Sequence, residues 1–286
     1  MKPTLWKSCT AFAAATQLTF AVPASGDTGQ KPLWELGIGI GGLALNDYRG
    51  SSAGHVYPVP VPYFAYRGTF LRADRDGIRA LFLDQDYFEL NISVNATTPV
   101  QSGSSGIRGG LSKLEPTLEI GPSLDLHLWR SRDDRLQLDL RMPLRESFTI
   151  DFSPRALGWS WAPRLNVDVQ DVAGRTGWNL GLLFGPVFQD RGYNQYFYGV
   201  APQFATAMRP AYQARGGYSG TQVLASISKR FPGYWIGAFL RHDFLSGAAF
   251  AGSPLLQTHD YWMGGVGIAW IVGRSATMVD VPDARP

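Results

Sequence analysis

Long stretches of this chain alternate between apolar and polar residues, and this alternation constrains the fold more than any other feature. Between positions 115 and 128 every even residue is Leu, Ile or Pro, whereas the odd residues are acids, hydroxyls, a glycine and a histidine. Positions 136–144 repeat the pattern, with leucines set against Gln137, Asp139 and Arg141. Successive side chains of a β-strand point to opposite faces, so a period of two predicts strands. The two segments are expected to form one antiparallel hairpin.

Further segments share this period, and several are too long for an ordinary soluble sheet. Alternation recurs at 34–40, 88–95, 165–170, 178–188, 221–229, 234–243 and 261–272. A transmembrane β-strand needs ~9–11 residues, against ~5–6 in typical globular strands. Aromatic residues gather near the segment ends, as they do at the two interfaces of a bilayer. The pattern favours a membrane barrel over the alternative, a soluble β-sandwich or lipocalin-like barrel.

Short and long connections alternate between these segments. The short ones are 84–86, 130–134, 173–175 and 231–232, and the long ones are 46–57, 98–114, 146–156, 190–214 and 245–259. Outer-membrane barrels have short periplasmic turns and longer outer loops. Segment 59–83 counts as one strand, or as three if it is split at Arg67-Gly68 and at 74–77. We predict an all-β fold, a closed antiparallel transmembrane β-barrel of ten or twelve strands.

The N-terminus is organised like an export signal. Lys2 and Lys7 precede a mostly apolar stretch that ends in small residues near position 24. A basic start, an apolar middle and a small-residue exit are typical of secretory signal peptides. We predict a signal peptide at 1–24, a linker at 25–32, the barrel at 33–272 and a periplasmic tail at 273–286. Cleavage would remove Cys9, the single cysteine, so the mature chain is not expected to form disulfides.

Composition and spacing exclude several functions. The net charge of +3 is too small to indicate nucleic-acid binding. The four histidines are not at ligand spacing, so neither a metal nor another cofactor is predicted. Gly37, Gly39 and Gly42 match the dinucleotide pattern G-x-G-x-x-G. They lie within a strand and not at a strand-to-helix turn, so we interpret them as small residues facing a crowded barrel interior.

The polar face of the strands points into the barrel if the apolar face meets lipid. Neighbouring strands then set acids against arginines, and a barrel of ten to twelve strands is narrow enough to be largely filled by such pairs. This pattern predicts an internal salt-bridge network, in either a closed structural barrel or a narrow, gated pore. The candidate lumen residues are Glu119, Asp125, Arg135, Asp139 and Arg141.

The longest outer connection, 190–214, is rich in aromatic residues. Exposed Tyr and Arg are what protein-recognition surfaces use. The loop is therefore a candidate partner-binding surface or, alternatively, a segment that folds inward and plugs the barrel mouth. The candidate residues are Tyr193, Tyr196, Phe197, Tyr198 and Tyr212.

One enzymatic hypothesis comes from the edges of another long loop. His242-Asp243 with Ser246, and His259-Asp260, could belong to a lipid or lipopolysaccharide hydrolase. A strained nucleophile motif such as G-x-S-x-G does not accompany them. Histidines at loop edges are more often surface hydrogen-bonding groups, so we predict a protein without enzymatic activity.

Several stretches together resemble the MipA/OmpV family of Gram-negative outer-membrane proteins. They are the glycine-rich strand 34–41, Asp-Tyr-Arg-Gly at 47–50, Val-Tyr-Pro-Val-Pro-Val at 56–61, Tyr-Arg-Gly at 66–68, Asn-Gln-Tyr-Phe-Tyr-Gly-Val at 194–200, and Tyr212. The resemblance covers roughly residues 34–272. It implies an outer-membrane barrel without enzymatic activity, for which the family supplies no agreed catalytic residues.

The resemblance also implies partners. The best-known member of the family links a murein-cleaving lytic transglycosylase to a murein-synthesising penicillin-binding protein. We therefore expect a scaffold in the outer membrane, surrounded by lipid and lipopolysaccharide, with these two enzymes as partners and without nucleic acid. A narrow diffusion channel for small solutes is the first alternative, and the hydrolase is the second.

Overall fold

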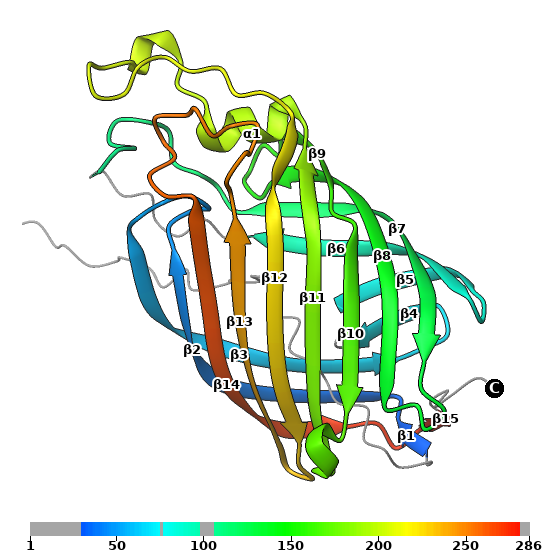
Figure 1. The fold of residues 1–286 in the computed structure, drawn as a ribbon. Helices are drawn as coiled ribbons and strands as arrows, with labels where there is room; N and C mark the ends of the chain where they lie inside the picture. Colours follow the sequence, from blue (N-terminus) through cyan, green and yellow to red (C-terminus); the bar gives the residue numbers. More distant parts are fainter. Residues whose placement is uncertain (1–29, 75–76, 98–105, 281–286) are drawn as a thin grey trace, which may run out of the picture.

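The computed structural model describes residues 30–74, 77–97 and 106–280, which form an antiparallel barrel (Figure 1). The expected signal peptide lies outside the described residues. The strands are β1 (Gln30–Pro32), β2 (Trp34–Asn46), β3 (Gly54–Arg67), β4 (Leu71–Asp74), β5 (Gly77–Asp84), β6 (Phe88–Thr97), β7 (Thr117–Arg130), β8 (Leu136–Thr149), β9 (Ala156–Trp161), β10 (Arg164–Gln170), β11 (Trp178–Gln189), β12 (Gly217–Arg230), β13 (Tyr234–Phe244), β14 (Asp260–Arg274) and β15 (Met278–Asp280). The helices are α1 (Arg191–Tyr198) and two 3₁₀ turns at Val172–Gly174 and Pro202–Phe204.

The barrel strands follow one another around a ring that closes between β14 and β2. β9 and β10 both pair with β8 and β11, so they are two halves of one strand. The interruption falls at Ala162-Pro163, where proline has no N–H to offer the ladder. Counted in this way, the described residues form a barrel of twelve strands. Of the two expected counts, ten and twelve, twelve is therefore confirmed, with segment 59–83 divided among β3, β4 and β5.

Apolar side chains cover the outer face of the barrel. Ile38 and Ile40 on β2 are 63% and 67% exposed, and Val266 on the neighbouring β14 is 61% exposed. Exposed aromatic residues lie toward both ends of the strands, namely Tyr87, Trp129 and Trp270 at the short-turn end and Trp159, Trp161 and Trp262 at the loop end. An apolar belt between two aromatic girdles is the surface that a bilayer requires.

The ends of the barrel region differ from the expected boundaries. β14 continues to Arg274, beyond the expected end at 272, and β1 pairs with β15 as a separate two-stranded sheet. This sheet lies at the short-turn end of the barrel (Figure 1). The segments expected to be a linker and a tail therefore each contribute a strand, which period-two analysis does not detect in runs of three residues.

The seam between β2 and β14 depends on a residue without a side chain. A Cβ atom on Gly39 would lie 1.8 Å from the carbonyl oxygen of Ile268 on β14. Only hydrogen fits there, so the glycines of this strand let two backbones approach closely. Gly42 differs, because a Cβ atom placed on it would meet nothing within 4 Å.

We expect Gly39→Ala to weaken the seam at which the barrel closes. Overpacking of this kind costs ~1–3 kcal/mol of unfolding free energy. The measurement is the temperature at which the purified, detergent-folded barrel converts to the unfolded gel mobility. Gly42→Ala is the matched control and should leave this temperature unchanged. Equal shifts in both variants would contradict the close approach at Gly39.

Candidate functional site

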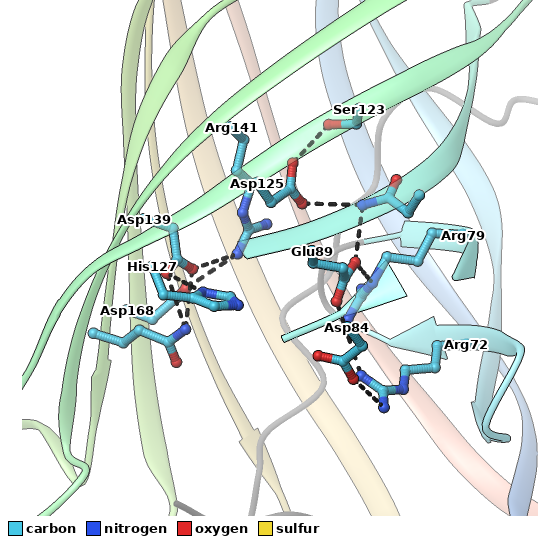
Figure 2. Close-up of polar contacts among 12 residues, drawn as sticks. Arg72, Arg79, Asp84, Glu89, Ser123, Asp125, His127, Asp139, Arg141 and Asp168 are labelled. Atoms are coloured by element: carbon cyan, nitrogen blue, oxygen red, sulfur yellow. Dashed lines mark hydrogen bonds and ion pairs between the residues drawn. The ribbon is translucent and has the colours of Figure 1, made fainter. Parts of the chain in front are cut away.

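Charged and polar side chains from several strands meet inside the barrel in a group that we call the central network (Figure 2). Its labelled members are Arg72, Arg79, Asp84, Glu89, Ser123, Asp125, His127, Asp139, Arg141 and Asp168. Arg79 Nε lies 2.9 Å from Glu89 Oε1, and Arg72 Nη2 lies 3.0 Å from Asp84 Oδ2. Asn91 Nδ2 donates to both Glu89 and Asp125, which joins β6 to β7.

The other half of the central network surrounds Asp139 on β8. Asp139 Oδ2 lies 3.1 Å from Arg141 Nη2, and its Oδ1 lies 3.0 Å from His127 Nδ1. Arg141 Nη2 also lies 3.7 Å from Asp168 Oδ2 on β10. Asp139 and Arg141 share the lumen face because they occupy alternate positions on one strand. Both are buried, and buried charges persist in a folded protein only when they are paired in this way.

The structure places all but one of the predicted lumen residues inside the barrel. Asp125, Asp139 and Arg141 belong to the central network, and Glu119 accepts from Tyr193 Oη at 3.1 Å. Arg135 requires a correction. It precedes β8 in a short turn, with a side chain that is 57% exposed and 3.7 Å from Asp133. The alternation had been extended one residue beyond the strand, where the chain already meets solvent.

Two ion clusters near the ends of the lumen were missed by sequence analysis. At the short-turn end, Glu35 on β2 accepts from Arg67 at 3.1 Å and from Arg230 at 2.8 Å. At the loop end, the fully buried carboxylate of Asp243 lies 2.6 Å from Arg49 and 2.7 Å from Arg241. Arg67 and Arg230 lie on other strands and Arg49 lies in a loop, so alternation within a strand gives no signal for them. Arg241 differs, because it lies two positions before Asp243 on the same face of β13. Arg49 belongs to the β2–β3 loop, and its ion pair ties that loop to the barrel wall.

Asp243→Asn should be strongly destabilising. The change preserves shape but leaves two guanidinium groups without their countercharge, which costs ~3–5 kcal/mol for a buried pair. The measurement is the denaturant midpoint of the purified barrel, followed by circular dichroism. Asp133→Asn, in an exposed turn, is the matched control and should behave as the wild type. A midpoint that is unchanged in Asp243→Asn would show that this cluster does not support the fold.

Four outer loops pack against one another at the opposite end from the short turns. Their shared core, which we call the loop core, consists of Tyr48, Leu114, Tyr198, Ala214, Leu245, Ala248 and Phe250. Tyr198 stacks on Phe250 with ring centroids 3.7 Å apart, and its hydroxyl donates to the carbonyl of Arg49 at 2.8 Å. The loops β2–β3, β6–β7, β11–β12 and β13–β14 all contribute to it.

Four of the five predicted aromatic residues of segment 190–214 lie in or against this core, and Tyr193 contacts Phe197 beside it. Tyr193 and Tyr198 are buried, and Tyr196, Phe197 and Tyr212 are partly buried against the core. The described part of the loop thus folds inward at these positions, whereas Met208 is exposed. Helix α1 was not predicted, because eight residues make only about two helical turns, too few for a helical period of 3.6 to be recognised in the sequence. Its start carries a signal that could have been used: Asp190 caps it by accepting from the Tyr193 N–H at 2.8 Å.

Two buried arginines join the β6–β7 loop to the β11–β12 loop. Arg209 Nη1 donates to the carbonyls of Ile107 and Gly109 at 2.7 and 2.8 Å. Arg108 Nη1 donates to the carbonyl of Phe197 at 2.7 Å. Burial lowers the pKa of the Arg108 guanidinium, although the neighbouring Tyr48 partly offsets this effect. The outer loops are therefore held by side chains that cross between them.

The tyrosines of the loop core should make the outer loops sensitive to alkaline pH. Burial raises the pKa of Tyr48 to about 12 and also raises the pKa of Tyr198. An unfolded tyrosine ionises near ~10. These folded pKa values lie above that value, so the stabilisation is complete below pH ~10 and is lost as the pH rises toward ~12.

We expect tyrosinate absorbance to show a late, cooperative phase in this pH range, while far-ultraviolet circular dichroism still reports the barrel. Tyr48→Phe, which loses the hydrogen bond to the Leu255 carbonyl, should reduce the amplitude of that phase. Tyr87→Phe, in an exposed short turn, is the control for the loss of one hydroxyl. A late phase of the same amplitude in Tyr48→Phe would contradict the assignment.

The candidate hydrolase residues do not assemble. His242 Nε2 lies 2.9 Å from Asp260 Oδ1, and its ring stacks on Trp262. Asp243 points to the opposite face of β13, where two arginines hold it. Ser246 and His259 are exposed in the following loop.

Within ranges 30–74, 77–97 and 106–280, no group of three or more His, Cys, Asp or Glu side chains could hold a metal ion. Across the same residues, no helix has the length and apolar character needed to cross a membrane.

Comparison with known proteins assigns the chain to a family. The family described as "MltA-interacting protein MipA" matches residues 38–272, which is most of the barrel. This chain belongs to the MipA family. A relative from Vibrio anguillarum, the outer membrane protein Omp26La, is 23% identical over 214 residues, or 72% of this chain and 76% of the relative. The outer membrane protein OmpV of Vibrio cholerae is 24% identical over the same shares of both chains.

Two solved structures align with most of this chain at low similarity. The CymD monoaromatic hydrocarbon channel is 11% identical, with 87% of this chain and 69% of that chain aligned at a TM-score of 0.30. The Ralstonia pickettii toluene transporter TbuX is also 11% identical, with 84% and 89% aligned at a TM-score of 0.26. Scores this low do not extend the likeness to function. The barrel and the named relatives place this MipA-family protein in the outer membrane of a Gram-negative bacterium.

Proposed function

We propose that this MipA-family protein is a non-enzymatic scaffold that holds a murein-cleaving lytic transglycosylase at the inner surface of the outer membrane. A penicillin-binding protein would join the same assembly, so that murein cleavage and murein synthesis stay adjacent. The description of the family as MltA-interacting supports the first partner. Lipid and lipopolysaccharide surround the exposed apolar belt of the barrel.

The observation that carries this proposal is that the inward-facing acidic groups are paired with arginines inside the barrel. Glu35, Asp139 and Asp243 are each held by one or more arginines, and the outer loops share a common core. The interior therefore holds the barrel together. The short-turn end remains as the surface that a periplasmic enzyme can reach.

The short-turn end carries groups suited to docking. The turn between β7 and β8 contains Arg132, Asp133 and Arg135, all exposed, which offers charges of both signs to a partner. The β1–β15 sheet adds backbone structure beyond the barrel at this same end (Figure 1). Arginine is enriched in the residues that dominate protein interfaces, so this turn is the best candidate for the contact.

Site-specific photocrosslinking in living cells tests the proposal. A photoreactive amino acid at Arg132 should capture a lytic transglycosylase, identified by mass spectrometry. The same amino acid at Met208, which is exposed in an outer loop, is the matched control and should not capture it. Arg132→Glu combined with Arg135→Glu should lower co-purification several-fold while the barrel remains heat-modifiable on gels. Capture that is absent at Arg132, or equal at both positions, would overturn the scaffold function.

A further inference from the structure

Part of the barrel wall lacks strand pairing among the described residues. β2 pairs with β3 from Gly54 to Tyr66, but β4 pairs with β3 only at Tyr66 and Arg67. On the other side of the hairpin, β5 pairs with β6 only as far as Ser93. The short β4–β5 hairpin closes the wall at the short-turn end, beside the longer β3 and β6 (Figure 1). Toward the loop end it leaves a break between β3 and β6.

Prolines occupy the edge of β3 that faces this break. The Arg67 N–H donates to the carbonyl of Leu33, on the β2 side of β3. Backbone groups of alternate residues point the same way, and the pairing of β3 with β2 has no register shift. The nitrogens of Pro58, Pro60 and Pro62 therefore point away from β2, toward the break. Proline has no N–H, so these positions offer no donor to another strand.

The break is therefore a property of the sequence as well as of the short hairpin. An unpaired strand edge within a membrane exposes N–H and C=O groups that lipid cannot satisfy. The three prolines remove three of the donors, although their carbonyls still face the break, and they prevent another strand from completing a full ladder there. The β3 border of the break is therefore poorly suited to pairing with an added β-strand.

Apolar side chains lie on both faces of β3 beside the break, one set toward the membrane and one set toward the lumen. On the membrane side, Val56 is 76% exposed and Phe64 is 44% exposed. On the lumen side, Tyr57 and Val59 pack against what we call the apolar lumen cluster. That cluster consists of Leu43, Leu45, Leu224, Phe239, Tyr261 and Met263.

The opposite border of the break is polar on its lumen face. Asn95 on β6 donates to Glu119 at 3.0 Å, and Ser93 accepts from Arg145 Nε at 2.9 Å. The break thus has an apolar side along β3 and a polar side along β6. A molecule with an alkyl chain and a polar head matches both borders.

We propose that the break between β3 and β6 is a lateral opening through which the acyl chain of an outer-membrane lipid enters the barrel. The chain lies along Tyr57 and Val59 against the apolar lumen cluster, and its polar head stays toward β6. This route is independent of the scaffold function, because it uses the membrane-embedded wall and not the short-turn end.

Acyl-chain photolabelling of the intact protein tests the route. The wild-type barrel is reconstituted in vesicles that contain a phospholipid with a diazirine on its acyl chain, and the adducts are mapped by mass spectrometry. Tyr57 and Val59 should be labelled several-fold more than Leu183. The membrane-facing Val56 should be labelled as well. Leu183 is the matched position, because it packs against the same apolar lumen cluster from β11, which is paired on both sides.

Three results would overturn the proposal. Labelling confined to membrane-facing residues such as Val56 would show that no chain enters. Equal labelling of Val59 and Leu183 would show entry by another path. Labelling of Tyr57 and Val59 by a free photoreactive fatty acid, but not by the phospholipid, would exclude the membrane lipid as the source. Val59→Trp, which narrows the apolar border, should reduce labelling of Tyr57 several-fold and leave Val56 unchanged.

Discussion

A strand that crosses a bilayer must find hydrogen-bond partners for its backbone on both edges, because the lipid interior offers none. The ring from β2 to β14 meets this constraint by pairing neighbours in sequence and by closing first strand on last. The closure requires backbones to approach so nearly that Gly39 has no room for a side chain. Where the ring is left unpaired, along β3, prolines remove donors from the open edge.

The need to satisfy polar groups away from bulk water also explains how the charges inside the barrel are arranged. Alternation that presents apolar residues to lipid necessarily turns the other residues inward, and many of these are charged. Asp139 with Arg141, Glu35 with Arg230, and Asp243 with its two arginines show how these charges are paired. The outer loops are also held by contacts among their own side chains, which are aromatic here: Tyr198 and Phe250 stack at their centre. The interior and the outer end are thus organised by internal contacts, and the short-turn end is where we propose that partners bind.

Much of this architecture could be predicted from the sequence, because a period of two is a local property. It located β7 and β8 and placed Asp125, Asp139 and Arg141 on the inner face. The alternation of short and long connections separated the short turns from the long loops, and breaks in segment 59–83 gave twelve as one of the two expected strand counts.

Contacts between distant segments could not be predicted in this way. Both partners of Glu35 lie on other strands, and Arg49 reaches Asp243 from a loop, so no pattern within one strand identifies them. The short extent of the pairing between β3 and β4 depends on how distant residues meet, and the period of two does not report it. Pro58, Pro60 and Pro62 are a local signal only that one edge of β3 lacks donors. Arg135 shows the opposite error, in which a local pattern was followed past the end of its strand.

Conductance in a planar bilayer tests the central claim most directly, since the claim is that paired charges and packed loops fill the barrel. The purified protein is inserted at moderate salt, and current is recorded at fixed voltage. The account predicts no stable, ohmic channel steps. Reproducible steps whose size changes when Asp125 or Arg141 is neutralised would contradict it and show that the lumen conducts ions.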